Sequence, residues 1–272
     1  GHRAIGVPLA GAADPLLLAC ANALLAQEAQ LAALEVALLG PILRAVGAPV
    51  RLALAGDFAP RLTREDGRVQ SPSSWRSLTL QPGELLATGP CRSGIGYVAW
   101  AGGAEVPMVL GSRSTYARAG LGGIDGRAPR AGDRLPCGAG HGAQRQAPRA
   151  FVHADGPLRV LPGPQDAIFD EEAWALFVGS DWRITREADR MGLRLQGPVL
   201  RHRAGCSADI VSEGVVPGAV QVPGAGQPIV LGVDAQTIGG YAKIATVISA
   251  DLPRLAHARP GSVLRFRAVP RD

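Results

Sequence analysis

The sequence predicts a mainly β protein with few helices, and three observations carry this prediction. The 272 residues include 36 Gly and 22 Pro, which break the chain into short segments. Within residues 49–56, Val50, Leu52 and Leu54 alternate in the manner of a strand. A Pro or Ala followed by Gly recurs in QPGELL, RAGDRL and RPGSVLRF. Each repeat predicts a type II-like turn that leads into a strand.

The clearest predicted helix begins at Asp14-Pro15 and runs to about Leu25, with Asp as the N-cap and Pro at the first helical position. A second, shorter helix followed by a strand is expected within residues 171–185. Apolar runs bounded by turn residues predict further strands. These runs are residues 31–40, 49–56, 227–235 and 244–252.

A stretch rich in Gly, Ala, Gln and Pro, residues 136–156, shows little periodicity and separates two halves of similar style. We therefore expect two domains, residues 1–145 and 146–272.

The charge balance excludes one class of partner and leaves another open. A net charge of +5 suggests an anionic partner, but the arginines are scattered and only 4% of residues are aromatic. A nucleic-acid partner is therefore not expected, because a stacking platform is missing. The charge balance is compatible with a pocket that binds a small anion.

The cysteines and histidines do not form a metal-binding or redox motif. The four cysteines lack a CxxC pair, and the five histidines lack HExxH and HxH spacing. We expect reduced thiols and no metal site. The cysteines are Cys20, Cys91, Cys137 and Cys206.

No segment predicts membrane insertion or export. Residues 15–27 are free of charge, but this run is shorter than the roughly 20 residues that span a bilayer. The N-terminal residues do not form a signal region, so a cytoplasmic location is the expectation.

Common catalytic signatures are also missing. The sequence contains neither a GxxxxGK[ST] phosphate loop nor a GxSxG nucleophile motif. Gly94 and Gly96 begin a loose GxGxxA match, but it lies in an expected strand with no helix after it, so we treat it as chance.

Residues 111–135 contain one candidate anion site. Ser112 and Ser114 flank Arg113, and several glycines follow. Hydroxyls, a guanidinium fork and backbone amides exposed by glycine together suit a carboxylate or a phosphate. The alternative is an exposed Gly-rich loop between strands.

The segment QTIGGYAK, residues 236–243, is a second candidate site. It contains Lys243, the single lysine among the 28 basic Lys and Arg residues, and chance loss of lysine is the alternative explanation. A simple hairpin would need only the glycines, whereas the other residues supply hydrogen-bonding groups and a cation. We therefore expect ligand binding by Gln236, Thr237, Gly239, Gly240, Tyr241 and Lys243.

Several motifs, among them GSRST, EADRMGLRLQGP and QTIGGY, resemble the family described as allophanate hydrolase subunit 2 or biotin-dependent carboxyltransferase. The resemblance covers nearly the whole chain, and bacterial members include the C subunit of ATP-dependent 5-oxoprolinase. It implies two cyclophilin-like β-barrel domains. Members usually have a further N-terminal strand with a TxQDxGRxG segment, and QTTGGYP where this sequence has QTIGGYA.

The resemblance also implies a function and partners. The expected activity is ATP-dependent conversion of 5-oxo-L-proline and water to L-glutamate, in a complex with two further proteins of the oxoprolinase. These are the homologous B subunit, which resembles allophanate hydrolase subunit 1, and the A subunit. ATP, with Mg²⁺, would be bound by the complex. Lys243 and Arg113 would stabilise anionic charge, Gln236, Thr237 and Tyr241 would orient the lactam or amide substrate, and Ser112 and Ser114 would assist.

Two alternatives stay open. The first is carboxyl transfer from carboxybiotin to a urea-like acceptor, with biotin on another chain because the sequence has no MKM-type acceptor. The second is a non-catalytic regulator that binds its subunit 1 homologue and thereby relieves inhibition of a histidine kinase.

Overall fold

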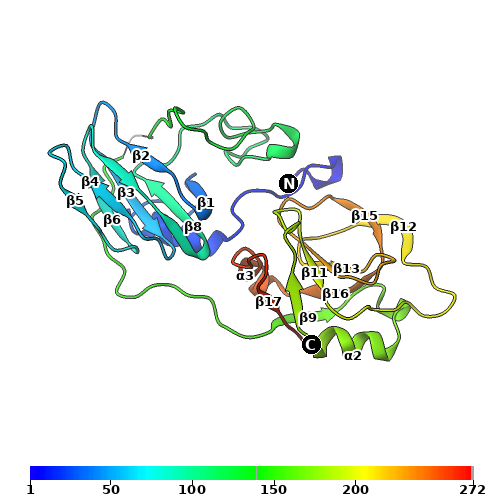
Figure 1. Ribbon diagram of the computed structural model, residues 1–272. Helices are drawn as coiled ribbons and strands as arrows, with labels where there is room; N and C mark the ends of the chain where they lie inside the picture. The colour runs from blue at the N-terminus through cyan, green and yellow to red at the C-terminus, as the bar shows by residue number, and fades with distance from the viewer. Residues whose placement is uncertain (139, 271–272) are drawn as a thin grey trace. The chain divides into compact units, whose positions relative to one another are not determined.

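The computed structural model describes residues 1–138 and 140–270, and in this part of the chain the protein is mainly β, as predicted. The chain forms two compact units: unit 1 comprises Gly1–Ala13 and His153–Asp272, and unit 2 comprises Asp14–Val152 (Figure 1). The division at residues 145 and 146, and the cyclophilin-like character of the domains, stay predictions. The α-helices of the described chain are α1 (Pro15–Ala23), α2 (Glu171–Gly179) and α3 (Leu252–Leu255).

Unit 1 contains an eight-stranded sheet in the order β17-β10-β11-β14-β13-β16-β9-β18. Its two edge strands, β17 and β18, are separated in the chain by Arg265 alone, so the sheet curls into a nearly closed barrel. The strands are β9 (Leu158–Pro162), β10 (Trp182–Ile184), β11 (Gly192–Gln196), β13 (Ala219–Gln221), β14 (Ile229–Leu231), β16 (Lys243–Val247), β17 (Val263–Leu264) and β18 (Phe266–Ala268). A separate antiparallel ribbon pairs β12 (Asp209–Gly214) with β15 (Ile238–Tyr241).

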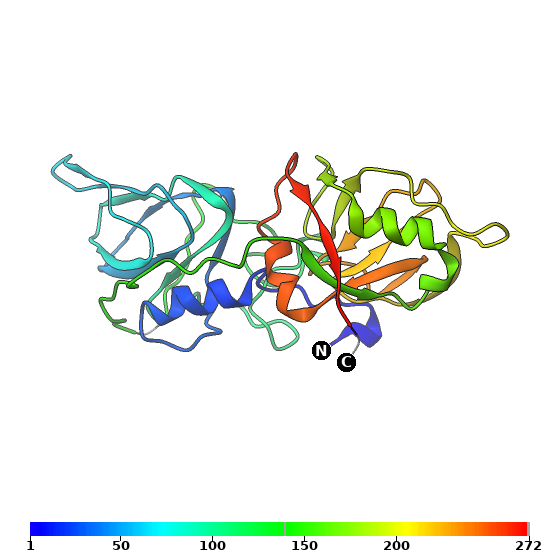
Figure 2. The ribbon, with the colours of Figure 1, turned by 90° about the horizontal axis from the view of Figure 1, so that it is seen from below.

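Helix α2 lies along the sheet (Figure 2), and aliphatic residues together with a few aromatic ones form the core of unit 1. The rings of Phe177 and Phe266 stack with centroids 4.5 Å apart, and buried Trp182 donates its indole N–H to the carbonyl oxygen of Phe177 at 2.9 Å. Helix α2 begins where the Asp170 carboxylate accepts the backbone N–H of Ala173 at 2.7 Å. The predicted helix followed by a strand is thus confirmed as α2 and β10.

Unit 2 contains two four-stranded sheets that share a bent pair of strands. Strand β1 continues into β2, and β7 continues into β8, so the β1–β8 pair of one sheet runs on into the β2–β7 pair of the other. The first sheet orders β1 (Leu34–Leu39), β8 (Pro90–Trp100), β3 (Val50–Ala55) and β6 (Arg76–Leu80). The second orders β2 (Ile42–Arg44), β7 (Leu85–Ala87), β4 (Arg61–Thr63) and β5 (Val69–Gln70).

Two glycines make this bend sterically allowed. The backbone N–H of Gly40 donates to the carbonyl of Gly89 at 3.0 Å, and the chains approach so closely that a Cβ at position 40 would lie 2.0 Å from Oγ1 of Thr88. Gly89 has a φ of +74°, and a Cβ there would lie 2.5 Å from the carbonyl oxygen of Ala59. The bend therefore requires residues without side chains.

The three predicted turns form with Gly at positive φ: +85° at Gly83, +91° at Gly132 and +86° at Gly261. The first and third turns lead into β7 and β17, as predicted. The second leads into no strand of the described chain, so that part of the prediction is wrong. The Asp133 carboxylate accepts the backbone N–H of Arg130 at 2.7 Å within the turn, and the residues after it form only an isolated bridge between Cys137 and Ala104, because no strand of the described chain pairs with them.

The predicted helix at Asp14 is confirmed, since the Asp14 carboxylate accepts the N–H of Leu17 at 3.0 Å at the start of α1. The strands predicted in residues 227–235 and 244–252 are shorter than expected, forming β14 and β16. Residues 249–255 instead form a 3-10 turn and α3. The segment expected to connect those two strands contains a strand, β15, because β12 supplies a pairing partner that local sequence does not reveal.

Asp251, in the turn after β16, binds strand β9. It accepts the backbone N–H of Arg159 at 2.8 Å and a two-point guanidinium contact at 2.8 and 3.1 Å. Burial opposes ionisation of Asp251, but these hydrogen bonds hold its pKa below the ordinary value. Asp251→Asn should therefore lower the free energy of unfolding at pH 7 by about 2 kcal/mol, since hydrogen bonds to charged groups are each worth roughly 1.5–3 kcal/mol.

The pH dependence follows from the sign of the shift. A carboxyl whose pKa is lowered in the folded state stabilises that state fully at pH values above its ordinary pKa, which is about 3.9 for Asp. This contribution to stability is lost as pH falls through the lowered pKa. Urea denaturation at pH 7 and below pH 4 measures the free energy of unfolding. Its fall between the two pH values should be smaller in Asp251→Asn than in wild type. Asp181→Asn, which breaks an exposed pair with Arg265, is the control and should lower the free energy of unfolding less than Asp251→Asn does. Equal losses in both variants would contradict the assignment.

Candidate functional site

The single lysine of the chain is buried in unit 1. Lys243 begins strand β16 and is only 3% exposed, an unusual environment for an ammonium group. Its Nζ lies 2.7 Å from Oε1 of Glu213, whose side chain is 44% exposed. The pair thus joins a buried cation on the barrel sheet to a carboxylate on the β12–β15 ribbon.

Gln165 completes a small polar network around this pair. Its side-chain N–H donates to Oε1 of Glu213 at 2.9 Å, and its side-chain oxygen accepts the backbone N–H of Lys243 at 3.3 Å. The contact from Lys243, followed by the hydrogen bond from Gln165, lowers the pKa of the Glu213 carboxyl from its ordinary value, and burial opposes this only in part. Glu213 is therefore ionised at neutral pH.

A second buried donor lies on the strand next to that of Lys243. Gln221 on β13 is the register partner of Lys243, so the two side chains leave adjacent strands next to each other. Gln221 is 2% exposed, and its Nε2 has no hydrogen-bond acceptor among the described residues. The Lys243 ammonium contacts Glu213 as an ion pair, but it makes no well-aligned hydrogen bond with any residue that the structure describes. Two buried donors thus retain capacity for an acceptor, which is unfavourable unless a ligand or water meets them.

Glycines allow the backbone to approach these groups. A Cβ at position 239 would lie 2.6 Å from Nε2 of Gln221, and a Cβ at position 163 would lie 2.1 Å from the carbonyl oxygen of Lys243. A Cβ at Gly240 would lie 3.2 Å from Oγ of Ser212. The first two positions therefore exclude any side chain, whereas Gly240 has somewhat more room.

The structure brings part of the predicted 236–243 site together. The Gln236 side-chain nitrogen lies 3.5 Å from the Cβ position of Gly239, near Gln221. Thr237 is buried, and its carbonyl accepts the backbone N–H of Val215 at 3.0 Å. Tyr241 is 40% exposed at the end of β15.

Three residues of this network were missed by sequence reasoning: Gln165, Glu213 and Gln221. They lie far from residue 243 in the chain. Strand pairing brings Glu213 and Gln221 near Lys243, and the loop after β9 brings Gln165.

The other predicted site residues belong to unit 2. Ser112 and Ser114 hydrogen-bond through their hydroxyls at 2.8 Å, and the exposed Arg113 donates from Nε to the carbonyl of Val106 at 3.1 Å. The loop is tightly folded, since a Cβ at position 122 would lie 2.1 Å from the carbonyl oxygen of Ser114. These contacts suit both the predicted anion cradle and the alternative of an exposed loop, and the cradle stays a prediction.

A second arginine of this loop is already neutralised. Arg127 makes a two-point contact with the Asp133 carboxylate at 2.7 and 2.9 Å. The hydrogen bond from Arg127 holds the pKa of Asp133 well below its usual range. Arg127 therefore holds the loop together and is not a free anion site.

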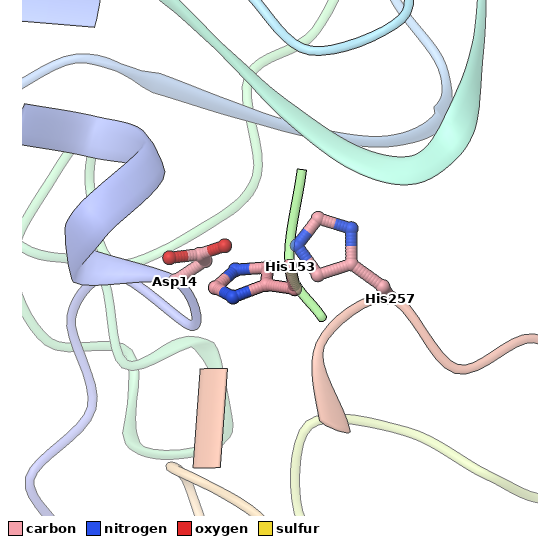
Figure 3. Close-up of side chains that lie close together, drawn as sticks. All are labelled: Asp14, His153 and His257. Atoms are coloured by element: carbon pink, nitrogen blue, oxygen red, sulfur yellow. The ribbon is translucent and has the colours of Figure 1, made fainter. Parts of the chain in front are cut away.

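Two histidines treated as isolated in the sequence lie side by side in unit 1. The rings of His153 and His257 are 5.1 Å apart between centroids at an interplanar angle of 61° (Figure 3). The absence of a metal site stays a prediction.

All four cysteines are free thiols. Burial, followed by a nearby carboxylate, raises the pKa of Cys20 and of Cys137, which disfavours the reactive thiolate form. Among the described residues, no helix has both the length and the apolar character needed to cross a bilayer.

These features define a mainly β protein with a polar site around one buried lysine. The chain belongs to the family described as carboxyltransferase domain, subdomain A and B, whose model matches residues 5–268. The resemblance found in the sequence is thereby confirmed.

Individual relatives agree with the family assignment. The 5-oxoprolinase C subunit of Escherichia coli (strain K12) is 36% identical over 277 residues, covering 98% of this chain and 84% of the relative. The crystal structure of TTHA0988 has a TM-score of 0.84 at 34% identity, covering 98% of this chain and 52% of that one. The urea carboxylase of Kluyveromyces lactis has a TM-score of 0.87 at 25% identity, covering 99% of this chain and 26% of that one. The chain thus spans about half of TTHA0988 and about a quarter of the urea carboxylase.

The network predicts how Glu213 responds when its cation is removed. Lys243→Met should raise the pKa of the Glu213 carboxyl toward its ordinary value, because the first cause of its lowering is lost. Carbon-13 NMR of labelled glutamate carboxyls, followed over pH, measures this shift. Gln165→Leu removes the weaker contact and should give a smaller rise. A Glu213 titration unchanged in Lys243→Met would show that the pair does not form in solution.

Proposed function

We propose that this chain is one component of a cytoplasmic, ATP-dependent 5-oxoprolinase that acts in complex with its homologous B subunit and with the A subunit. The observation that carries the proposal is the pair of buried donors, Lys243 and Gln221, in a chain 36% identical to a 5-oxoprolinase C subunit. The overall reaction adds water to 5-oxo-L-proline, breaks its lactam C–N bond and yields L-glutamate, coupled to conversion of ATP to ADP and phosphate.

The site suits the charge that this reaction creates. Attack on a lactam carbonyl develops negative charge on the carbonyl oxygen, and preorganised donors stabilise that charge most effectively where water is excluded. The Lys243 ammonium and the Gln221 amide would supply these donors. Because Lys243 Nζ is buried against Glu213, the substrate would reach it by displacing the Glu213 carboxylate.

The remaining predicted residues would position the substrate. Gln236, Thr237 and Tyr241 would orient it, and the backbone at Gly239 and Gly240 would approach it closely. Within unit 2, Arg113, Ser112 and Ser114 would bind an anionic group.

ATP fits the residues around Lys243 poorly. A triphosphate calls for several cationic groups, or a cation with a row of backbone amides, whereas this site offers one ammonium that already contacts a carboxylate. The site fits one anionic group. Binding of ATP and Mg²⁺ is therefore proposed for the assembled complex, and no step at Lys243 involves them.

Carboxyl transfer is the second candidate, and the likeness to the Kluyveromyces lactis urea carboxylase supports it. The same two donors would then bind the carboxylate delivered from carboxybiotin on another chain. Incubation of the chain with a carboxylated biotin carrier and urea separates the candidates, because only the second predicts loss of the carboxyl group from biotin. Tight binding to the homologous B subunit with no turnover in either assay would instead support the third alternative, a non-catalytic regulator.

Substitution of Lys243 tests the first candidate in the complete complex. Lys243→Met should lower 5-oxoproline-dependent ADP release by at least about 100-fold, as expected for loss of one transition-state donor. Lys243→Arg keeps the charge but should also lose more than about 10-fold, because a planar guanidinium does not replace a compact ammonium in a buried site.

Arg44→Gln, on exposed strand β2, is the matched control and should keep the wild-type rate. Circular dichroism and co-purification with the partner proteins check folding and assembly. No ADP release from the folded wild-type complex would refute the proposed activity, and a normal rate in Lys243→Met would remove Lys243 from the site.

A further inference from the structure

Unit 2 contains a pocket of its own, about 440 Å³ in volume. It is built on strands β4 to β6 and the segments next to them. Polar side chains dominate its lining, and two of them are arginines. The lining residues used below are Arg64, Gln70, Arg76, Thr79, Gln81 and Gln144.

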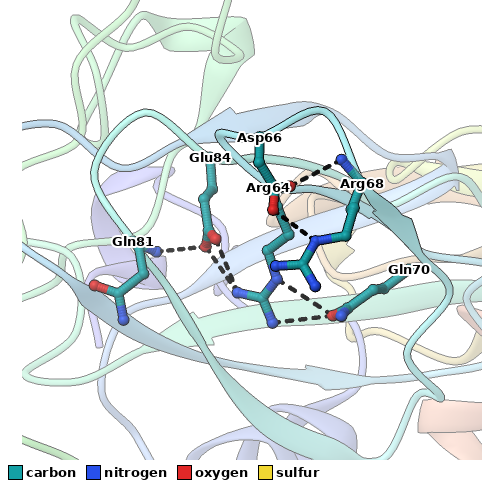
Figure 4. A network of polar contacts seen from close by, with 6 residues as sticks. All are labelled: Arg64, Asp66, Arg68, Gln70, Gln81 and Glu84. Carbon is teal, nitrogen blue, oxygen red and sulfur yellow. Dashed lines mark hydrogen bonds and ion pairs between the residues drawn. The ribbon is translucent and has the colours of Figure 1, made fainter.

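The first arginine, Arg64, is fully compensated (Figure 4). Its Nη1 donates to both carboxylate oxygens of Glu84 at 2.9 and 3.0 Å, and its Nε and Nη2 donate to the Gln70 side-chain oxygen at 3.3 and 2.9 Å. Glu84 also accepts the backbone N–H of Gln81 at 2.8 Å. Burial opposes ionisation of Glu84, but these hydrogen bonds lower its pKa, so the carboxylate stays charged and cancels Arg64.

The second arginine, Arg76, is not compensated. It begins strand β6 and lines the pocket, and its guanidinium has no hydrogen-bond or ion-pair partner in the described residues. Its Nε is buried. A buried donor on a charged group is unfavourable without an acceptor, so the geometry calls for one.

The backbone beside Arg76 is held in an unusual conformation. Trp75 has a φ of +61°, which is rare for a bulky residue. Two backbone hydrogen bonds fix it: its N–H donates to Leu54 at 2.8 Å, and its carbonyl accepts from Ala147 at 2.9 Å. Conformations of this kind persist where the surroundings enforce them and are concentrated at ligand sites.

We propose that this pocket binds a small monocarboxylate, whose carboxylate is held by the Arg76 guanidinium. The planar fork of arginine matches a carboxylate in two-point geometry. The amides of Gln81 and Gln144 and the hydroxyl of Thr79 suit an uncharged amide or hydroxyl of the same ligand. One uncompensated cation balances one negative charge, which disfavours a polyphosphate, and the volume suits a small molecule. The site consists of unit 2 residues alone and does not depend on the proposed 5-oxoprolinase activity.

NMR of the full chain labelled with nitrogen-15 arginine tests this assignment directly. The Arg76 Nε–H signal is identified by its absence in Arg76→Gln, or in Arg76→Lys should the first variant fold poorly. Titration uses acetate and N-acetylglycine as monocarboxylates, N-acetylglycinamide as the uncharged counterpart, and orthophosphate. We expect saturable movement of the Arg76 signal with both carboxylates, tighter binding of N-acetylglycine than of acetate, and no response to N-acetylglycinamide.

The variants supply the controls. Binding of N-acetylglycine, followed on backbone amide signals of the pocket, should weaken at least tenfold in Arg76→Gln. It should be unchanged in Arg68→Gln, an exposed arginine of the same region that pairs with Asp66 outside the lining. Binding should also be unchanged in Lys243→Met, because Lys243 does not line this pocket. A negative result for the proposed activity at Lys243 therefore does not affect this binding test. No saturable movement with either carboxylate, undiminished binding in Arg76→Gln, or equal binding of orthophosphate would overturn the proposal.

Discussion

The buried ammonium of Lys243 is the constraint around which the site in unit 1 is arranged. A lone charge in a protein interior is strongly unfavourable, so it has to be paired. Glu213 reaches it from the β12–β15 ribbon, Gln165 holds the carboxylate, and the same glutamine accepts the backbone N–H of Lys243. A barrel sheet and a separate ribbon are thereby joined by one ion pair. The incomplete hydrogen bonding of the ammonium and of Gln221 leaves this centre able to bind a further acceptor.

In both units, glycines allow the main chain to approach neighbouring atoms closely. Gly163 and Gly239 let main chain lie against Lys243 and Gln221, and Gly40 and Gly89 let a strand pair bend from one sheet of unit 2 into the other. In each case a Cβ would lie closer to a neighbouring atom than van der Waals contact allows. The high glycine content of the chain therefore has specific steric causes at these positions, in addition to supplying turns.

The arginines divide into compensated and uncompensated groups, and this division carries more information than net charge. Arg64, Arg127, Arg159 and Arg190 each meet a carboxylate at hydrogen-bond distance and thereby fix strands or loops. Arg76 meets none in the described chain, although it lines a pocket. A net charge of +5 indicates an anionic partner only in general terms, whereas the pairing pattern and the pocket lining together are the basis for proposing Arg76 as an anion site.

The sequence by itself determined the features that depend on local chemistry. Asp14-Pro15 encoded a helix start, Gly83, Gly132 and Gly261 encoded turns, and alternation in residues 49–56 encoded strand β3. The motifs also identified the family, whose model matches residues 5–268. Tertiary structure alone decided what depends on pairing between distant segments. Strand β15 exists because β12 lies beside it. Strand pairing brings β12 with Glu213 and β13 with Gln221 to Lys243, and the loop after β9 brings Gln165. A residue's own neighbours in the chain carry no record of which distant strand will pair with it, so these contacts could not be read from the sequence.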